Sequence, residues 1–347
     1  MLTPKRLETL LETFAGLRIG VVGDFFLDAY FDCDASLDEK SLETGRTCYQ
    51  VVRTRRQAGA AGTVAANLKA LGVGRVDAVG FCGDDGEGYE LRRAMAAMKL
   101  DLTHFFCHPN RFTPTYGKPC YINAAQRNSP VVIELERLDI KNRRPTPVVL
   151  QEDIISSIRA QLDSWDGLVL LDQVSEANCG VLTSRVRRAV LAELRRRPDK
   201  IALADSRERI HLFKHVMIKP NQFEAVQVLR DRRQTSSMKA AEHARALVRQ
   251  THRPVFVTLG AKGMLVATDD QTDRAPGVSV SGPIDPVGAG DAASAAIVAA
   301  MAAGAEALEA AHIANLAASI TVQQIGTTGT ASPAQIRRRH REARHGL

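Results

Sequence analysis

The stretch that decides the fold reads Asp285-Pro286-Val287-Gly288-Ala289-Gly290-Asp291, and an alanine-rich run of helical character follows it directly. Small residues let the backbone turn tightly with its N–H groups converging, and the start of a helix adds positive potential at the same place. A cradle of this kind can stabilise the charge that develops on a migrating phosphoryl group, while the adjacent carboxylate of Asp291 accepts the proton of a hydroxyl. The stretch therefore predicts a site for phosphoryl transfer, although a glycine pair before a helix is also a common turn.

Length and composition favour a large soluble α/β protein. The chain has 347 residues, of which 45% are hydrophobic, so it can bury a large core and is too apolar for a disordered chain. Its six cysteines show no paired spacing, which is typical of reduced thiols in the cytoplasm. No segment approaches the roughly 20 apolar residues of a membrane helix, and no basic segment with a long apolar run opens the chain. We predict a cytoplasmic protein with no membrane partner.

The net charge of +7 raises the alternative of a nucleic-acid partner. The arginines within residues 185–197, however, are interleaved with apolar residues at helical spacing, which predicts the solvated face of a helix. Aromatic residues make up only 5% of the chain and do not alternate with the arginines, so no surface for stacking single-stranded bases is indicated. We predict no nucleic-acid partner, since a positive field would equally attract anionic small molecules.

Strands and helices alternate along most of the chain. Apolar strand candidates lie at 17–22, 76–81, 168–171, 201–204, 216–218 and 255–259, and helical sequence separates most of them. This rhythm predicts an α/β fold with a doubly wound, mostly parallel sheet flanked by helices, in a single domain over residues 1–347. Two segments, about 31–56 and 105–139, break the rhythm with irregular, β-like sequence. We assign both to one small β sheet that acts as a lid over a site.

Two further segments carry polar residues and glycines at the ends of predicted strands. Asn221 and Glu224 stand three apart at the start of a helix, where one face could present them to magnesium-bound water and phosphate oxygens. The same spacing is typical of a capping box, in which Glu224 serves only the helix terminus. From Thr258 onwards, Gly260 and Gly263 permit close approach of the backbone to a nucleotide, although a plain hairpin would use the same residues.

In this order, the segments resemble the ribokinase-like (PfkB) carbohydrate kinase family over nearly the whole chain. The resemblance rests on five motifs, each weak alone and specific in combination. They are Gly59-Ala60 with Asn67 and Leu71-Gly72, residues 80–88, Asn221 with Glu224, residues 258–263, and Gly288-Ala289-Gly290-Asp291. Within the family, Gly23-Asp24 with Leu27-Asp28 and the residues 137–139 and 204–206 look most like the heptose-7-phosphate kinase branch.

The resemblance implies a kinase that transfers the γ-phosphoryl group of ATP, with Mg²⁺, to a hydroxyl of a small-molecule sugar or sugar phosphate. Asp291 would be the catalytic base, and the backbone amides of Gly288, Ala289, Gly290 and Asp291 would form the anion hole. In the family, the carboxylate that matches Asp285 often joins a K⁺ site beside that hole. In relatives the lid often pairs two subunits, so the resemblance also implies a homodimer.

For the nucleotide, the resemblance implies five residues. Asn221 and Glu224 would belong to the magnesium and phosphate network, with Glu224 acting on Mg²⁺ through water. Thr258, Gly260 and Gly263 would lie along ATP.

For the acceptor, the resemblance places sugar hydroxyls against Asp24, Asp28, Gly59, Ala60 and Asn67. The chain also departs from the family pattern, because relatives commonly carry Gly-Gly-Ala-Ala-Asn where this chain reads Gly59-Ala60-Ala61-Gly62-Thr63. A hydroxyl thus replaces an amide that touches the sugar.

The identity of the acceptor stays open at this point. Lys118, Arg127 and Arg137 are candidates to meet a phosphate on it. A nucleoside acceptor is disfavoured because the lid is polar. The alternative function is a catalytically silent regulatory protein of the same fold that binds a sugar or a nucleotide.

Overall fold

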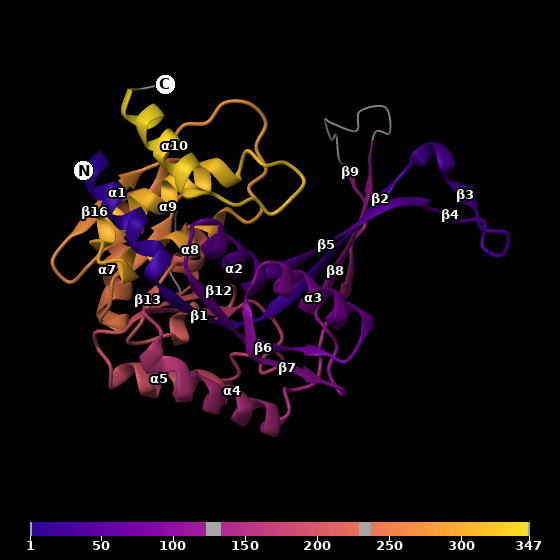
Figure 1. Ribbon diagram of the computed structural model, residues 1–347, viewed down its shortest axis with the longest axis horizontal. Coiled ribbons are helices and arrows are strands. Elements are labelled where there is room, and N and C mark those ends of the chain that lie inside the picture. Colours follow the sequence, from indigo (N-terminus) through magenta and orange to yellow (C-terminus); the bar gives the residue numbers. More distant parts are fainter. Residues whose placement is uncertain (1, 123–132, 229–236, 346–347) are drawn as a thin grey trace.

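A sheet of nine strands forms the centre of the protein (Figure 1). The structure is a computed structural model, and it describes residues 2–122, 133–228 and 237–345. The strands follow the order β16-β15-β14-β13-β12-β11-β1-β6-β7, and neighbours are parallel except where β15 pairs with β14 and β16. Their bounds are β1 Arg18–Gly23, β6 Arg75–Gly83, β7 Asp101–His108, β11 Gly167–Asp172, β12 Ile201–Ser206, β13 Met217–Ile218, β14 Val255–Thr258, β15 Gly263–Ala267 and β16 Thr272–Pro276. The predicted mostly parallel α/β sheet is confirmed.

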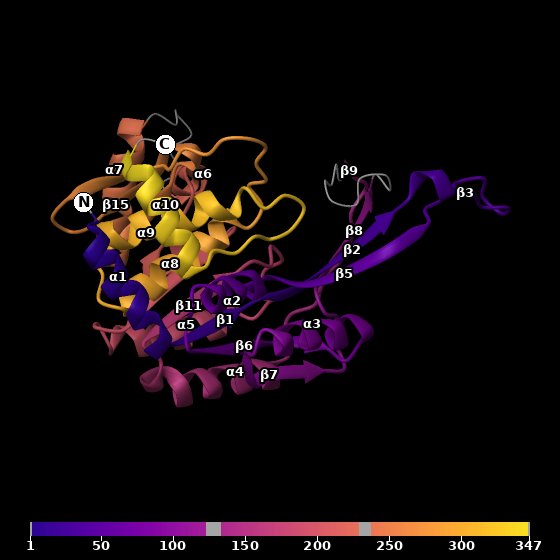
Figure 2. The same ribbon diagram turned by 45° about the horizontal axis from the view of Figure 1, so that its top comes forward.

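Helices cover both faces of this sheet (Figure 2). One face carries α1 Pro4–Thr13, α2 Ala61–Ala70, α3 Gly86–Ala97, α8 Ala289–Ala302, α9 Ala307–Thr321 and α10 Pro333–His345. The other face carries α4 Val148–Gln161, α5 Ser184–Arg195, α6 Gln222–Val228 and α7 Ser237–Thr251. The apolar side chains form a separate buried cluster on each face, as expected for a doubly wound sheet.

Helix α8 lies deep in the first of these layers. Residues 292–300 are all buried, and the helix packs against α2, α9 and strands β11 and β12. Most of these residues are alanines, whose small side chains let the helix lie close to its neighbours. The first turn of α8 is therefore held firmly at one place on the sheet.

A second, smaller sheet projects from one side of the large one (Figure 1). Its strands follow the order β10-β8-β2-β5, and β9 pairs with β8. Their bounds are β2 Phe25–Cys33, β5 Val51–Ala60, β8 Thr115–Tyr121, β9 Ile133–Glu134 and β10 Leu138–Ile140, and a hairpin of β3 Glu39–Lys40 and β4 Thr47–Cys48 extends beyond them. We call this sheet with its hairpin the lid. The prediction that both irregular segments build one small sheet is confirmed.

The lid differs from the predicted segments at its edges. It already begins at the start of β2 and continues to the end of β5, beyond the expected 31–56. The expected segment 105–139 begins too early, because residues 105–108 belong to β7 at the edge of the large sheet. The buried ring of Phe105 packs edge-to-face on Phe25, with centroids 5.2 Å apart, and this contact keeps β7 on the core. Residues 123–132 of that segment lie outside the described residues.

Strand β1 lies between β6 and β11, so the order of the large sheet reverses at this strand. In open parallel sheets such a reversal leaves a crevice at the carboxyl ends of the strands, and ligands bind there. Charged residues gather at this edge. Asp24 follows β1, Asp172 is the last residue of β11, Asp205 is the second-last residue of β12, and Lys219 follows β13. The topology therefore predicts a ligand site at this edge.

The six cysteines, all within the described residues, are free. Across residues 2–122, 133–228 and 237–345, no helix combines the length and apolar character required to cross a membrane.

Candidate active site

Helix α8 starts at the carboxyl edge of the sheet with a left-handed residue. Gly288 caps the helix at φ 81°, a conformation that suits glycine because L side chains rarely adopt it. The N–H groups of a first helical turn have no partner within the helix, and they carry the positive end of its dipole. Asp291 stands in this turn. The cradle and the carboxylate therefore share one turn of helix.

The surroundings of Asp291 raise its pKa to about 7. Burial is the largest cause, and the negative charge of Asp205 adds to it, with a smaller contribution in the same direction from Asp28. The positive charges of Lys219 and Arg207 act in the opposite direction. A carboxyl group whose pKa lies near neutrality is well matched to accept and release protons at that pH. The arrangement suits a general base.

A buried ion pair that the sequence interpretation missed lies next to this turn. The Nζ of Lys219 is 2.9 Å from Oδ2 of Asp205, and the hydroxyl of Ser294 on α8 donates to the same oxygen at 2.9 Å. All three residues are at most 9% exposed. A Cβ atom added to Gly290 would lie 3.7 Å from this Nζ, so the ammonium group stands beside the cradle. The sequence signal that could have indicated this pair is that both charged residues stand at the ends of buried apolar strands, where ligand sites of such sheets lie.

Asn221 and Glu224 form a capping box at the start of α6. Oδ1 of Asn221 accepts the N–H groups of Phe223 and Glu224 at 2.8 and 2.9 Å, and Oε2 of Glu224 accepts the N–H of Asn221 at 2.7 Å. The capping box that the spacing predicts is confirmed. It uses one oxygen of each side chain, so it leaves Nδ2 of Asn221 and Oε1 of Glu224 available for another partner. Burial raises the pKa of Glu224, and a cation bound beside it would oppose this effect.

The end of β14 lies beside Asn221. Thr258 forms an isolated parallel bridge with that residue, and the chain then turns into the antiparallel strand β15. Gly260 and Gly263 in this turn have φ values of 60° and 92°. A Cβ atom at Gly263 would lie 2.3 Å from the carbonyl oxygen of Ala275, so only glycine fits there. The hairpin interpretation is confirmed, and the hairpin brings this segment next to the capping box.

Asp285 joins the loop before α8 to the loop after α9. Its Oδ1 accepts the N–H of Val287 at 3.0 Å, and its Oδ2 accepts the N–H of Gly326 at 3.2 Å. Its own N–H donates to the carbonyl of Val322 at 2.7 Å. The carboxylate therefore fixes the approach of the chain to the cradle.

On the lid, Asp28 and Lys118 form a second buried ion pair. The Nζ of Lys118 is 3.1 Å from Oδ1 of Asp28 and 3.3 Å from the hydroxyl oxygen of Tyr30. A Cβ atom on Gly59 would lie 2.7 Å from Oδ2 of Asp28, so glycine lets this carboxylate approach the backbone before α2. The charge of Asp28 raises the pKa of Asp291, so the carboxylate of the lid lies close enough to that of the helix start to act on it electrostatically.

Of the other two basic candidates, the described one, Arg137, lies on a different part of the lid. The guanidinium of Arg137 is 4.1 Å from the ring centroid of Tyr116, and its Nε is 2.6 Å from Oδ1 of Asp139. Arg127 lies outside the described residues. Of the two candidates within the described residues, Lys118 is the one that lies beside a predicted acceptor residue.

Helix α2 begins with a strained residue. Ala60, the N-cap, has φ 52° and ψ −114°, a backbone conformation that favours glycine. Further along, the buried Asn67 donates through Nδ2 to the carbonyls of Thr63 and Gly329 at 3.0 and 3.3 Å, while its buried Oδ1 has no partner within the described residues. Thr63 itself lies against the cradle, since a Cβ atom on Gly288 would be 3.6 Å from its methyl group.

Asp24 organises the loop after β11. Its Oδ2 accepts the N–H groups of Gln173 and Val174 at 2.8 and 3.0 Å, and its Oδ1 accepts the N–H of Val181 at 2.7 Å. Burial, together with the charge of Asp172, raises the pKa of Asp24 to about 6. Both oxygens thus already bind this loop, a role that the sequence did not indicate.

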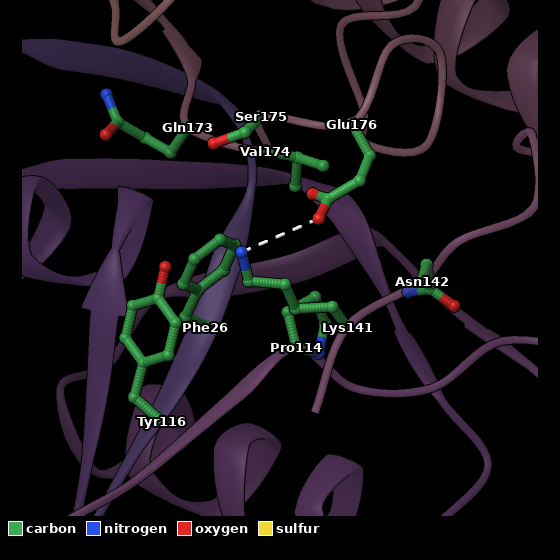
Figure 3. Close-up of a pocket in the computed structure, with 9 residues that line it drawn as sticks. All are labelled: Phe26, Pro114, Tyr116, Lys141, Asn142, Gln173, Val174, Ser175 and Glu176. Carbon is green, nitrogen blue, oxygen red and sulfur yellow. Dashed lines mark ion pairs between the residues drawn. The ribbon is translucent and has the colours of Figure 1, made fainter. Parts of the chain in front are cut away.

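The loop meets the lid at a narrow pocket, where Phe26 and Tyr116 face residues 173–176 (Figure 3). The two aromatic rings pack edge-to-face with centroids 5.1 Å apart, and Lys141 pairs with Glu176 at 3.6 Å. The cavity measures about 10 Å³, which is close to the space of one water molecule. A roomier hollow of about 500 Å³ lies beside α3 and shares no residue with the predicted site.

Two side chains of β5 tie the lid to the loop after α9. Arg55 donates to the carbonyl of Gly326 at 2.9 Å, and Nε2 of Gln57 donates to the hydroxyl of Thr327 at 3.0 Å. Gly326 is also the residue that binds Asp285. The lid is therefore connected through one loop to the segment that leads into the cradle.

The residues present fit a nucleotide-bound magnesium ion better than a protein-held one. Among the described residues, no group of three or more histidine, cysteine or carboxylate side chains is placed to hold a metal ion. Magnesium in nucleotide sites usually keeps several waters and takes one or two carboxylates plus phosphate oxygens. The half-buried Glu224, with one oxygen outside the capping box, meets that requirement.

Comparison with known proteins agrees with this site. The model of the pfkB family of carbohydrate kinases matches residues 21–335. The chain belongs to this family, and its enzyme class is that of the phosphotransferases that act on sugars.

The curated relatives include bifunctional proteins called HldE. That of Geotalea uraniireducens (strain Rf4) is 30% identical over 336 residues, which cover 96% of this chain and 64% of the relative. That of Rhodopseudomonas palustris (strain BisB18) is 28% identical over 286 residues, covering 82% of this chain and 55% of the relative. The chain therefore spans less than two thirds of the length of these relatives.

Solved structures share the fold at lower identity. The ribokinase of Arabidopsis thaliana, complexed with ribose and ATP, gives a TM-score of 0.66 at 17% identity and covers 93% of this chain and 98% of its own. Phosphofructokinase-2 of Escherichia coli, in complex with potassium, gives a TM-score of 0.70 at 16% identity. The match covers 94% of this chain and 99% of the phosphofructokinase chain. The predicted ribokinase-like fold is confirmed.

Proposed function

We propose that this protein transfers the γ-phosphoryl group of ATP to a hydroxyl of a sugar or sugar phosphate, with Asp291 as the general base. The observation that carries the proposal is a half-buried carboxylate, with a pKa of about 7, in the same helical turn as a glycine-capped cradle. Asp291 takes the proton of the acceptor hydroxyl as its oxygen attacks phosphorus, and the amides of Gly288, Ala289, Gly290 and Asp291 offset the charge on the group in transfer.

The nucleotide lies along Thr258, Gly260 and Gly263 in this proposal. Their position beside the capping box supports it, because the Nδ2 of Asn221 can then donate to a phosphate oxygen. Glu224 would hold Mg²⁺ through water, and the ion, when bound, would neutralise charge between phosphate groups. Asp285 is assigned to a K⁺ site, a role favoured by its position between the two loops that flank the cradle.

The acceptor lies between the lid and the start of α2. We assign its hydroxyls to Asp28, with Gly59 and Ala60 forming the wall behind that carboxylate. Lys118, paired with Asp28, offers a cation to an acceptor that carries a phosphate. Asp24 and Asn67 act on the acceptor indirectly, since their hydrogen bonds position the loop after β11 and the loop after α9.

We also propose that the protein works in the cytoplasm as a dimer paired through the lid. The lid exposes apolar side chains at its far end, among them Leu42, Val51 and Val52, which are 100%, 47% and 50% exposed. A second lid would cover such residues. Sedimentation of the protein, with and without residues 34–50 of the lid, tests this part of the proposal.

The activity is tested with ATP, Mg²⁺ and a panel of free sugars, sugar phosphates and nucleosides. ADP release and the mass of the product are followed together, so that hydrolysis by water is distinguished from transfer. A product heavier than its acceptor by one phosphoryl group supports the proposal. If the protein binds both ATP and a sugar but forms no product with any acceptor, the alternative of a catalytically silent binding protein takes its place.

A further inference from the structure

Beyond their opposing effects on the pKa of Asp291, Lys219 and Asp205 have no task in the mechanism above. Removing two charges from water costs free energy that their mutual attraction often fails to offset, so a buried pair of this kind adds little to the stability of a fold. Lys219 is 5% exposed and Asp205 is 9% exposed, which makes that cost substantial here. The pair therefore calls for a functional explanation.

The position of the ammonium group supplies one. Lys219 follows β13 at the carboxyl edge of the sheet, and its Nζ lies 3.7 Å from the place of a Cβ atom on Gly290 in the cradle. Among the described residues, the carboxylate of Asp205 is within hydrogen-bonding distance, while the charges of Glu224 and Asp291 also act on the lysine. An ammonium group has three N–H donors, and the bond to Asp205 occupies one of them.

Asp205 and Ser294 hold this ammonium in a fixed direction. The hydroxyl of Ser294 donates to the same Oδ2 that receives Lys219, and Ser294 is fully buried on the second turn of α8. A charged donor whose partners are fixed in advance needs no reorganisation when charge develops nearby, and this is the most effective form of electrostatic catalysis.

We propose that Lys219 is a further catalytic residue: its ammonium group contacts the γ-phosphoryl group beside the cradle during transfer, with Asp205 and Ser294 as positioning residues. This inference rests on the proposed kinase activity. No bond to Lys219 forms or breaks; the acceptor proton goes to Asp291, the phosphorus–oxygen bond to ADP breaks, and Lys219 neutralises charge on the equatorial oxygens. The cradle amides supply partial charges, whereas Lys219 supplies a full one.

The test replaces Lys219 with glutamine, which still donates a hydrogen bond to Asp205 but carries no charge. We expect turnover to fall by roughly a hundredfold, the low end for the loss of one transition-state donor. Binding of ADP should change by less than about twofold, while the analogue AMP-PNP, which keeps a γ-phosphoryl group, should bind roughly tenfold more weakly. Ser294→Ala should likewise weaken binding of AMP-PNP more than binding of ADP, and its turnover should fall by less than that of Lys219→Gln.

A matched control is Lys69→Gln, since the ammonium group of Lys69 donates to backbone carbonyls, at 3.1 and 3.0 Å, and lies on α2 outside the site. If Lys219→Gln fails to fold, the double variant Lys219→Gln with Asp205→Asn removes both charges together and is measured in its place. Equal weakening of ADP and AMP-PNP, or turnover within about threefold of the parent protein, would overturn the assignment of Lys219. A parent protein that binds nucleotide but phosphorylates no acceptor would instead overturn the kinase proposal, so the two failures are distinguishable.

Discussion

Replacing Asp291 with asparagine is expected to stabilise the fold at alkaline pH. Burial raises the pKa of this side chain from 3.8 to about 7, so the folded protein binds the proton more tightly than the unfolded chain does. The free energy of unfolding therefore falls as the pH rises from the unfolded pKa to the folded one, and it levels off above that range. Asparagine has no proton to release, so the variant escapes this decrease.

The size of the effect follows from the shift. About three pKa units correspond to about 4 kcal/mol at roughly 1.4 kcal/mol per unit. This is an upper bound because the half-buried side chain keeps some contact with water, and we expect about 2 kcal/mol in favour of the variant above pH 7. Well below the folded pKa most of the difference disappears, because the carboxyl group of the folded protein is then protonated.

Urea unfolding of both proteins at pH 4.5 and pH 8.5 measures the difference. The exposed Asp270, in the turn between β15 and β16, gives the control Asp270→Asn, which should change the free energy of unfolding by less than about 0.5 kcal/mol at either pH. The burial argument would be refuted if the free energies of unfolding of the parent protein and of Asp291→Asn differed by the same amount at both pH values. It would also be refuted if the variant were less stable than the parent protein at pH 8.5.

Three further predictions concern the acceptor side. Ala60→Gly should raise the free energy of unfolding by about 1 kcal/mol in urea, because relief of the strain at φ 52° and ψ −114° exceeds the entropy that glycine adds to the unfolded chain; a loss of stability would contradict this. Asp24→Ala should lower it by about 3 kcal/mol, since three N–H groups lose their acceptor, and should raise the KM for the acceptor more than that for ATP; unchanged values would exclude the positioning role. Gln57→Ala should speed hydrogen exchange in β5 by roughly tenfold at unchanged global stability, and equal protection in both proteins would show that its bond to Thr327 does not hold the lid.

Local features of the site could be predicted from the sequence. The turn at Gly288, the helix that carries Asp291, and the capping box of Asn221 and Glu224 all depend on residues within a few positions of one another. Six of the nine strands of the large sheet were recognisable for the same reason, since their apolar runs are short and contiguous, whereas β7, β15 and β16 were not predicted as strands of this sheet. Strand β2 was harder to recognise as part of the lid, because its polar residue Asp28 is buried in an ion pair rather than exposed.

Contacts between distant segments could not be predicted. Asp205 lies on β12, Lys219 follows the neighbouring strand β13, and the serine that completes their cluster lies on α8. The family resemblance assigns Asp24 to sugar hydroxyls, but the amides that occupy its oxygens come from a loop about 150 residues further along the chain. Such pairings are decided by the sheet order, which local patterns do not contain.

The most direct test of the account measures phosphoryl transfer by Asp291→Asn with a responsive acceptor and saturating ATP and Mg²⁺. We predict that turnover falls by at least about a hundredfold while the dissociation constant for ATP stays within about twofold of the parent value, because the general base acts on the acceptor proton and not on the nucleotide. Turnover close to that of the parent protein would contradict the central claim that this carboxylate removes the proton.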